Sequence, residues 1–269
     1  MQIYTHDDVR RVVEYAAFRG IRVMPEWDTP GHSYSWGVYY RELLTQCCDA
    51  AGRPDGTVGP MDPTRDSTYA FVAQLLRESS DVFPERLVHL GGDEVFVNCR
   101  QSNPNVTAFM AQAGIAGNYS ALQSLYVERV VNITAQVLRK TPVLWQEAFE
   151  HGARVGTSTA VVQVWTGSFY HVLADVTRAG YRALLSACWY LNNIFTAADW
   201  HVFYQCDPQR FEGSAAQKRL VIGGEAAIWG EWVDATNLVS RTFPRGSAVA
   251  ERLWSDASAT SALLLMLYI

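Results

Sequence analysis

Short apolar runs alternate with amphipathic helical stretches along most of the chain. Thr5 and Asp8 have the spacing of a capping box, and apolar residues then recur at helical intervals up to Gly20. Further helices are predicted for residues 69–76 and 119–138. Strands are predicted at six apolar runs, centred near residues 23, 88, 144, 162, 184 and 221. This alternation is typical of an α/β fold with a parallel sheet covered by helices.

The length of the chain favours one large domain. Its 269 residues are close to the ~250 residues of a typical (β/α)8 barrel, so residues 1–269 are expected to form a single domain. The stretch before residue 69 is rich in glycine and proline and is expected to be a long connection. The six predicted strands are two fewer than a closed eight-stranded barrel needs.

Composition and charge exclude several classes of protein. With 49% hydrophobic and 18% charged residues, the chain can bury a large core and is neither disordered nor collagenous. Its net charge is −5 and no basic run stands out, so nucleic acid is not an expected partner. No run, the apolar tail 262–269 included, approaches the ~20 apolar residues of a membrane span. Because polar residues (Gln2, Thr5, His6 and Asp7) closely follow Met1, we expect no signal peptide before the first predicted helix.

Cysteine and asparagine positions bear on the cellular compartment. The five cysteines are an odd number, so at least one is unpaired within the chain, and none has the spacing of a CxxC zinc motif. Three sequons, at Asn105, Asn118 and Asn132, would permit glycosylation in a secretory compartment. Such tripeptides are common by chance, so they only favour that compartment.

Acidic and aromatic residues follow every predicted strand. In parallel α/β folds, functional residues gather where strands end and loops begin. Each such residue has an ordinary explanation, as a capping acid or a core aromatic, but six strand ends with the same composition favour a common site. The residues concerned are Glu26, Asp28, His32, Asp93, Glu94, Trp145, Glu147, Trp165, Trp189, Tyr190, Asn192, Trp229 and Glu231.

Carboxylates combined with aromatic platforms point to glycoside hydrolysis. Because Asp93 and Glu94 are adjacent, their side chains diverge and are poorly placed to flank a glycosidic bond from opposite sides. The pattern instead favours a substrate-assisted mechanism, in which a 2-acetamido group attacks the anomeric carbon. One acid would then orient that group while the other protonates the leaving group.

Five motifs in this order resemble the β-N-acetylhexosaminidases of glycoside hydrolase family 20. They are Gly-Ile-Arg-Val-Met-Pro-Glu-Trp-Asp-Thr-Pro-Gly-His (20–32), His-Leu-Gly-Gly-Asp-Glu-Val (89–95), Trp-Gln-Glu (145–147), Cys-Trp-Tyr-Leu-Asn (188–192) and Gly-Gly-Glu-Ala-Ala-Ile-Trp-Gly-Glu (223–231). The segments 233–238 and 248–255 resemble the lysosomal-type enzymes of eukaryotes. The resemblance extends to about residue 256.

The resemblance implies a retaining glycosidase that removes terminal non-reducing N-acetylhexosamine (GlcNAc or GalNAc) from glycoconjugates. It implies Glu94 as general acid/base and Asp93 as the residue that orients the acetamido group, with Asp28 and His32 supporting the acid. The implied substrate-binding residues are Trp145, Trp165, Tyr190, Asn192, Trp229 and Glu231. A disulfide between Cys47 and Cys99 is implied, which would leave Cys48, Cys188 and Cys206 free or differently used. The family pattern implies a lysosomal or secreted location and a homo- or heterodimer. It implies neither a metal nor a cofactor.

Three departures from the family pattern change these expectations. Asn192 matches the alpha subunit of the lysosomal pair more than the beta subunit, but Asn193 stands where that subunit has arginine, and Arg100 stands where relatives commonly have tryptophan. The family's N-terminal domain and first two barrel strands would precede Met1. We therefore expect an N-terminally incomplete chain, a TIM-type barrel lacking its first two strands, with about six parallel strands and no non-catalytic N-terminal domain.

Three alternatives remain open. The chain could be an inactive fragment or pseudo-enzyme that binds glycans or a complete partner subunit. Residues 91–95 also match the signature of cyclic-dinucleotide synthases, but that motif lies on a hairpin and continues with phenylalanine, whereas here a predicted parallel strand precedes it and Val95 follows Glu94. A metal hydrolase is disfavoured because no HxH or HExxH motif occurs.

Overall fold

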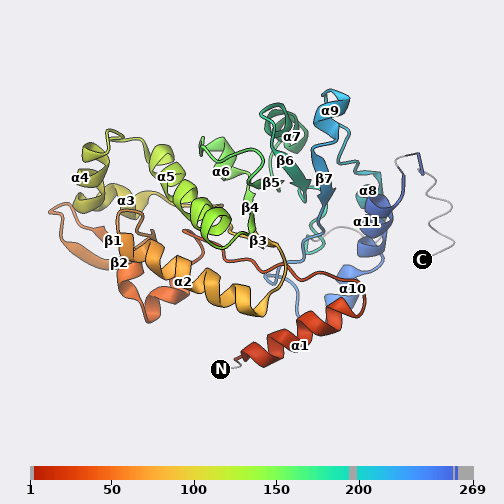
Figure 1. Cartoon of the computed structure of the whole chain (residues 1–269), viewed down its shortest axis with the longest axis horizontal. Helices are drawn as coiled ribbons and strands as arrows, with labels where there is room; N and C mark the ends of the chain where they lie inside the picture. The colour runs from red at the N-terminus through yellow and green to blue at the C-terminus, as the bar shows by residue number, and fades with distance from the viewer. Residues whose placement is uncertain (1–2, 194–198, 257, 260–269) are drawn as a thin grey trace. The chain divides into compact units, whose positions relative to one another are not determined.

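The computed structural model describes residues 3–193, 199–256 and 258–259. The predicted apolar tail 262–269 lies outside the described residues. In chain order the elements are α1 (His6–Ala17), η1 (Tyr34–Val38), η2 (Arg41–Leu43), β1 (Leu44–Cys48), β2 (Pro54–Met61), α2 (Asp66–Val82), β3 (Leu87–His89), α3 (Asn98–Ser102), α4 (Pro104–Gln112), α5 (Tyr119–Asn132), η3 (Ile133–Val137), β4 (Thr141–Trp145), α6 (Glu147–Glu150), β5 (Val161–Val164), α7 (Phe169–Arg178), β6 (Arg182–Leu185), α8 (Trp200–Gln205), α9 (Ala215–Lys218), β7 (Val221–Gly224), α10 (Leu238–Thr242) and α11 (Arg245–Trp254) (Figure 1).

The strands of the predicted parallel sheet form one sheet in the order β3-β4-β5-β6-β7. Leu87 pairs in parallel with Thr141, and Ala183 pairs in parallel with Val221. All four residues of β5 are buried, as is typical of parallel strands that are covered on both faces. The α/β class with a parallel sheet is therefore confirmed, with five strands in this sheet.

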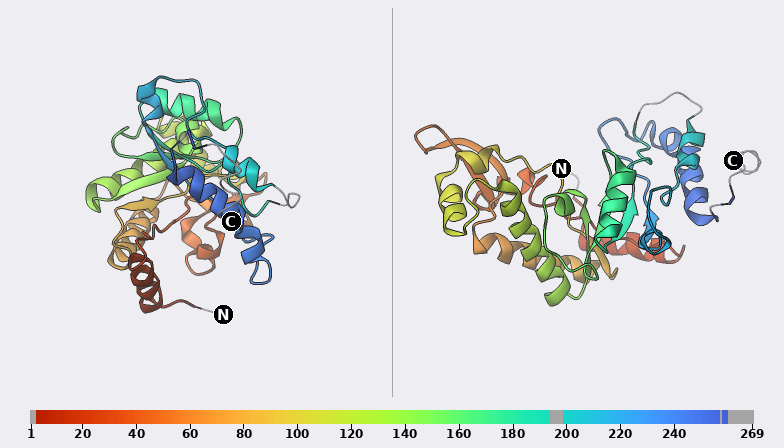
Figure 2. Two further views of the ribbon diagram at one scale, coloured as in Figure 1. Left: turned by 90° about the vertical axis from the view of Figure 1, so that its right-hand side faces the viewer. Right: turned by 90° about the horizontal axis from the view of Figure 1, so that it is seen from above.

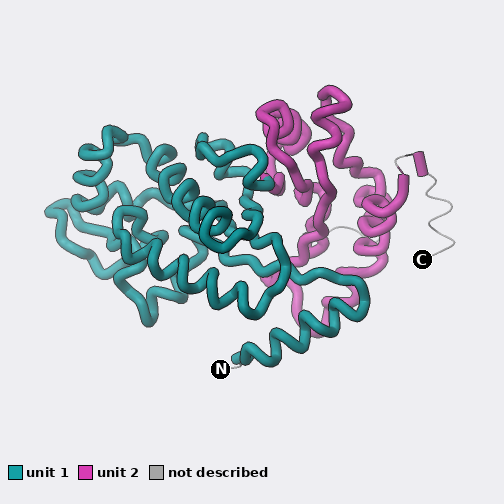
Figure 3. The backbone as a smooth tube through the Cα atoms, viewed as in Figure 1, with its two compact units in different colours: residues 1–161 teal, residues 162–269 magenta. Residues whose placement is uncertain are grey.

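The chain divides into two compact units, residues 1–161 and 162–269 (Figure 3). The first unit has a core in which α2 and α5 pack against β3 and β4. Its buried side chains include Tyr69 and Leu76 from α2, Tyr126 from α5, Val88 from β3 and Leu144 from β4. Apolar residues at helical spacing in α2 and α5 thus cover one side of two short buried strands.

Helix α1 begins as the sequence predicts. The Thr5 hydroxyl accepts a hydrogen bond from the Asp8 backbone N–H at 3.1 Å, while Asp8 Oδ2 accepts one from the Thr5 N–H at 2.9 Å. These two bonds satisfy donors that a helix start leaves unpaired. The helix ends before Gly20, which adopts a φ of +70° that glycine accepts without strain.

The predicted strand at residues 21–26 is wrong as an extended element. Only Glu26 forms a bridge, to His89, beside hydrogen bonds from Trp27 N–H to His89 O and from His89 N–H to Pro25 O. Pro25 has no N–H to donate, which interrupts any continuous ladder at this point. The segment nevertheless runs beside β3, and it brings Asp28 and His32 toward the residues that follow β3.

The connection expected before residue 69 contains an antiparallel hairpin of β1 and β2. The two views of Figure 2 show it as the orange ribbon beside α3 and α4. Its turn is held by Asp49, whose carboxylate accepts hydrogen bonds from the N–H groups of Ala51 and Arg53. The hairpin was not predicted because Pro54, Gly56, Gly59 and Pro60 occupy the second strand.

In the second unit, strands β6 and β7 are paired and helices α8 and α11 pack together. Arg245 at the start of α11 forms a buried ion pair with Asp199 at 2.8 Å and donates to the Leu191 carbonyl at 2.8 Å. These bonds fix the segment that follows Tyr190. Among the described residues, no helix is both long and apolar enough to cross a membrane. The single-domain expectation for residues 1–269 stays a prediction.

Candidate active site

The turn after β3 places Asp93 and Glu94 on a tightly constrained backbone. Gly91 has a φ of +70°, and a side chain at this position would collide with the carboxylate of Asp28. The Gly92 N–H donates to Asp28 Oδ1 at 3.0 Å. Glu94 itself has a φ of +49°, a left-handed conformation that costs a non-glycine residue about 1–3 kcal/mol. The two acids are therefore held by a glycine turn that packs against Asp28.

His32 contacts three carboxyl groups, those of Asp28, Asp93 and Glu94. Its Nδ1 lies 2.5 Å from Asp28 Oδ2 and 3.6 Å from Asp93 Oδ1, and its Nε2 lies 3.3 Å from Glu94 Oε2. A short contact of this kind favours the tautomer in which Nδ1–H donates to Asp28, which directs Nε2 toward Glu94. His32 can therefore hold the Glu94 carboxyl in position and exchange a proton with it.

The neighbouring acids Asp93 and Glu94 differ in their environment. Asp93 is 13% exposed at its side chain, whereas Glu94 is 51% exposed. Burial, and next the charge of Asp28, raises the pKa of Asp93 to about 7, although His32 opposes this shift. Burial alone would lower the pKa of His32, but the hydrogen bond and charge of Asp28, with Asp93 and Glu94, raise it. The protonation of Asp93 and that of His32 therefore depend on each other and on the charge of Asp28.

One oxygen of Asp93 is left over for a ligand. Asp93 Oδ1 is buried and has no hydrogen-bond partner among the described residues. A buried polar atom without a partner is costly, and such atoms often mark functional sites. An N–H donor on a bound ligand would satisfy this oxygen.

The same cluster must be considered as a metal site. Asp28, His32 and Asp93 each offer one ligand atom, and these atoms lie within 4.8 Å of one another. Two ligands at about 2.0–2.1 Å from one tetrahedral ion are more than 3 Å apart. The 2.5 Å separation between His32 Nδ1 and Asp28 Oδ2 is instead that of a hydrogen bond. The observed geometry therefore fits proton exchange better than metal ligation.

Two further residues lie near this turn: Glu26, which was a candidate strand-end acid without an assigned role, and His89, which was missed as a site residue. Glu26 Oε1 accepts a hydrogen bond from Trp145 Nε1 at 3.0 Å and lies 3.3 Å from His89 Nδ1. Burial would raise the pKa of Glu26, but the hydrogen bonds and charge of His89 and Trp145 hold it below its usual value. The His89 ring lies 4.5 Å from the Trp145 ring. A histidine in the middle of an apolar strand was the available signal.

Trp145, the last residue of β4, is thereby fixed on two sides. Its side chain is 3% exposed. Because Glu26 holds the indole N–H and His89 packs against the ring, the orientation of the indole is set by residues of the same unit. Of the residues predicted for the site, the first unit thus brings together Asp28, His32, Asp93 and Glu94, with Trp145 held separately by Glu26.

The remaining predicted residues belong to the second unit. The rings of Trp165 and Tyr190 lie 6.4 Å apart at 36°, and the backbone of Tyr190 bridges to Ala227. Asn192 is buried, and its Oδ1 has no partner among the described residues. Trp229 and Glu231 are exposed. This unit therefore presents an aromatic pair, a buried amide and two exposed side chains.

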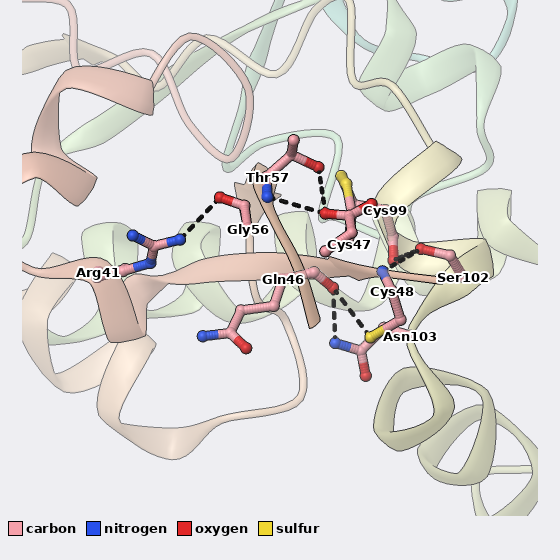
Figure 4. The surroundings of a disulfide bond; sticks show 10 residues. Arg41, Gln46, Cys47, Cys48, Gly56, Thr57, Cys99, Ser102 and Asn103 are labelled. Atoms are coloured by element: carbon pink, nitrogen blue, oxygen red, sulfur yellow. Dashed lines mark hydrogen bonds between the residues drawn. A yellow bond between two sulfur atoms is a disulfide. The ribbon is translucent and has the colours of Figure 1, made fainter. Parts of the chain in front are cut away.

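Two disulfides occur among the described residues. Cys47, close to the turn of the hairpin, is joined to Cys99 of α3, as the resemblance implied (Figure 4). Of the three cysteines expected to be free or differently used, Cys188 and Cys206 form a second disulfide, and Cys48 is free. The two partners are 18 residues apart in sequence, and no spacing rule pairs them. Arg100, next to Cys99, is fully buried and donates to Gln123 Oε1 at 2.8 Å.

Comparisons with known proteins agree with this arrangement. Residues 1–257 match the model of glycosyl hydrolase family 20, catalytic domain. The chain is 48% identical over 260 residues to beta-hexosaminidase subunit beta of Felis catus, and 49% identical over 258 residues to beta-hexosaminidase subunit alpha of Bos taurus. The match covers 96% and 94% of this chain, respectively, and 48% of each relative. The chain thus spans about half the length of these curated relatives.

A solved structure is similar as well. The X-ray structure of a chitobiase from Flavobacterium johnsoniae superposes with a TM-score of 0.83 at 28% identity, covering 98% of this chain and 40% of that one. Alpha and beta subunits match almost equally, so the predicted preference for the alpha type gains no support from identity. The family match covers nearly the whole chain, and the chain therefore belongs to glycosyl hydrolase family 20.

Proposed function

We propose that the protein removes terminal non-reducing N-acetylhexosamine from glycoconjugates, with retention of configuration and with the substrate's own acetamido group as nucleophile. The observation that carries this proposal is the buried, unpartnered Oδ1 of Asp93 beside the more exposed carboxyl of Glu94. An acetamido N–H is a donor of the right kind for Asp93 Oδ1. Glu94 has the access that an acid needs to reach a leaving oxygen.

In the first step, the acetamido carbonyl oxygen attacks the anomeric carbon while the bond from that carbon to the leaving oxygen breaks. The electron pair of that bond passes to the leaving oxygen, which takes the proton of the Glu94 carboxyl. Asp93 in its deprotonated form accepts the acetamido N–H and offsets the positive charge of the oxazolinium ring that forms. His32, held by Asp28, keeps the Glu94 carboxyl oriented through the transfer.

In the second step, water attacks the same carbon and gives its proton to the Glu94 carboxylate. The bond to the acetamido oxygen breaks, which restores the acetamido group and leaves the sugar with its original configuration. Two inversions at one carbon account for retention without an enzyme-bound sugar. The step needs no group other than those named.

The other predicted residues keep their roles as proposals. Trp145, Trp165 and Trp229 are proposed to contact the acetamido group, with Tyr190 donating to its oxygen. Glu231 is proposed to bind sugar hydroxyls, and Asn192 to contact substrate further out. The clamp of Glu26 and His89 on Trp145 supports a wall function for this indole, because a wall must keep one orientation.

Fold, assembly and location follow from family membership as further proposals. We infer a (β/α)8 barrel of which this chain supplies the strands β3 to β7, supported by their parallel pairing and by the TM-score of 0.83. A homo- or heterodimer is proposed because the relatives are named as subunits. A lysosomal or secreted location is supported by the two disulfides, which persist in oxidising compartments.

The test is hydrolysis of a chromogenic N-acetyl-β-glucosaminide by the purified chain, beside the matching glucoside that has a hydroxyl in place of the acetamido group. We expect cleavage of the first and not of the second, with release of the β-anomer when the reaction is followed by NMR. An Asp93→Asn variant should lose most of the activity. Equal cleavage of both compounds, release of the α-anomer, or no cleavage by a folded chain would contradict the proposal.

A further inference from the structure

We propose that a cavity beside Glu94 binds the pyranose ring of the leaving group, with Phe96 and Tyr34 as the aromatic faces against which that ring packs. This inference rests on the proposed function and adds to it the class of leaving group that the protein prefers. The cavity has a volume of about 370 Å³ and lies within the first unit. Pockets for small ligands have volumes of roughly 300–1,000 Å³.

The position of the cavity selects its occupant. Glu94 and His32 line it, whereas Asp93 and Trp145 do not. In the proposed reaction the acetamido group lies against Asp93 and the leaving oxygen lies against Glu94. The cavity therefore lies on the side of Glu94 from which the leaving group departs, and the ring that carries the leaving oxygen must be next to it.

The lining suits a sugar ring. Phe96 and Tyr34 line the cavity and are 74% and 71% exposed, so most of each residue is accessible to a ligand. Val58 and Pro60 of β2 add apolar surface, and the exposed side chain of Asn98 adds an amide. A pyranose presents an apolar C–H face and a rim of hydroxyl groups. Aromatic faces contact the former, and amide or hydroxyl groups bond the latter.

The wall of the cavity is rigid enough to select a ligand. The disulfide of Cys47 and Cys99 lines it and ties β1 to α3. Gly59 of β2 packs so closely that an added Cβ would lie 2.8 Å from Cys99 Cβ. The disulfide and this close packing limit how far this part of the wall can move.

The experiment compares two substrates that share the N-acetylglucosaminyl group and differ in what leaves. One is the β-1,4-linked disaccharide of N-acetylglucosamine, whose leaving group is a pyranose, and the other is N-acetyl-β-glucosaminyl fluoride, whose leaving group cannot reach Phe96. We expect Phe96→Ala to lower kcat/KM for the disaccharide about three- to tenfold, as for the loss of one aromatic packing contact. The value for the fluoride should stay within about twofold. Phe96→Tyr should restore the disaccharide value.

Phe18→Ala is the matched control, because Phe18 is 91% exposed, belongs to the same unit and does not line the cavity. This variant should change kcat/KM for neither substrate. An equal loss on both substrates, or no loss on either, would overturn the subsite while leaving the proposed function intact. A chain that cleaves neither compound contradicts the proposed function. In that case the subsite is tested by equilibrium binding. The subsite requires the disaccharide to bind more tightly than N-acetylglucosamine, and Phe96→Ala to reduce this difference in affinity.

Discussion

Two regions meet at Glu94 and His32: the polar cluster of Asp28, His32 and Asp93, and the cavity that Phe96 and Tyr34 also line. The cluster is mostly buried, its groups lie 2.5–3.6 Å apart, and its backbone carries left-handed residues at His32 and Glu94. The cavity is bounded by two exposed rings, Tyr34 at the start of η1 and Phe96 in a loop. Backbone strain and burial are thus concentrated where the chemistry would occur, whereas the surface that would choose the leaving group is made by exposed side chains.

If this contrast is correct, substitutions in the cluster should affect every substrate, and substitutions at the cavity should affect only some. The largest effect is expected for Glu94→Gln, which removes the proton donor. Loss of a general acid lowers rates by about 10²–10⁴-fold. The loss in kcat/KM should be near the upper end for the disaccharide and much smaller for the fluoride, which leaves without a proton. Equal losses on the two substrates would show that Glu94 does not act as the acid.

The next effect concerns stability and pH. The pKa of Asp93 is near 3.9 in an unfolded chain and about 7 in the folded one. Between these values the unfolded chain releases a proton that the folded chain keeps, so this group favours the folded state in acid and loses that contribution as pH rises to 7. His32 acts in the same direction, because its raised pKa stabilises the folded state below about 6.5.

Replacing Asp93 with Asn should remove most of this dependence. We expect the free energy of unfolding of the wild type, relative to Asp93→Asn, to fall by about 2–4 kcal/mol between pH 4 and pH 8 in urea titrations. Asp55→Asn serves as the control, because Asp55 is exposed and its hydrogen bonds with Thr57 lower its pKa. That variant should show no difference between pH 5 and pH 8. A flat profile for the Asp93 pair would refute a raised pKa in the cluster.

The sequence predicted much of this contrast, but not all of it. Asp28, His32, Asp93 and Glu94 follow short apolar segments and belong to specific motifs, so both their chemistry and their proximity were predictable. The helix starts and the buried strands β3 to β7 follow from local patterns. The failed strand at 21–26 contains Pro25, whose effect on a ladder outweighed the apolar run.

The cavity side was not predictable for a physical reason. Strand β2 contains prolines and glycines that ordinarily mark loops. It is held by contacts with other elements, such as the hydrogen bond from Arg41 to the Gly56 carbonyl at 2.8 Å (Figure 4) and the close packing of Gly59 against Cys99. Phe96 is an exposed aromatic residue in a loop, and exposure depends on what surrounds a residue rather than on its neighbours in sequence. Loop geometry of this kind is set by tertiary contacts.

A third prediction tests whether the rigid wall of the cavity matters. Gly59→Ala would place a Cβ 2.8 Å from Cys99 Cβ and 2.9 Å from its Sγ, and the disulfide limits how far these atoms can move. We expect a loss of about 1–3 kcal/mol in unfolding free energy, as for overpacking, measured by urea titration. Gly230→Ala, which has open space around it, should be within about 0.5 kcal/mol of the wild type. If both variants are equally stable, the contact at Gly59 is not tight in solution.

The smallest effect should come from the residues that hold Trp145. Glu26→Ala removes the carboxylate that accepts the indole N–H of Trp145, whereas Glu26→Gln keeps an oxygen within reach. If Trp145 walls the acetamido pocket, a loosened indole should admit larger acyl groups. The ratio of kcat/KM for N-acetyl and N-butanoyl substrates should therefore fall about fivefold in Glu26→Ala, equivalent to the ~1 kcal/mol of one hydrogen bond, and much less in Glu26→Gln. A merely structural role for Glu26 would lower both substrates together and leave the ratio unchanged. A changed ratio would show that the buried side of the site, like the cavity side, selects substrates, but does so through an indole held by a carboxylate rather than through exposed rings.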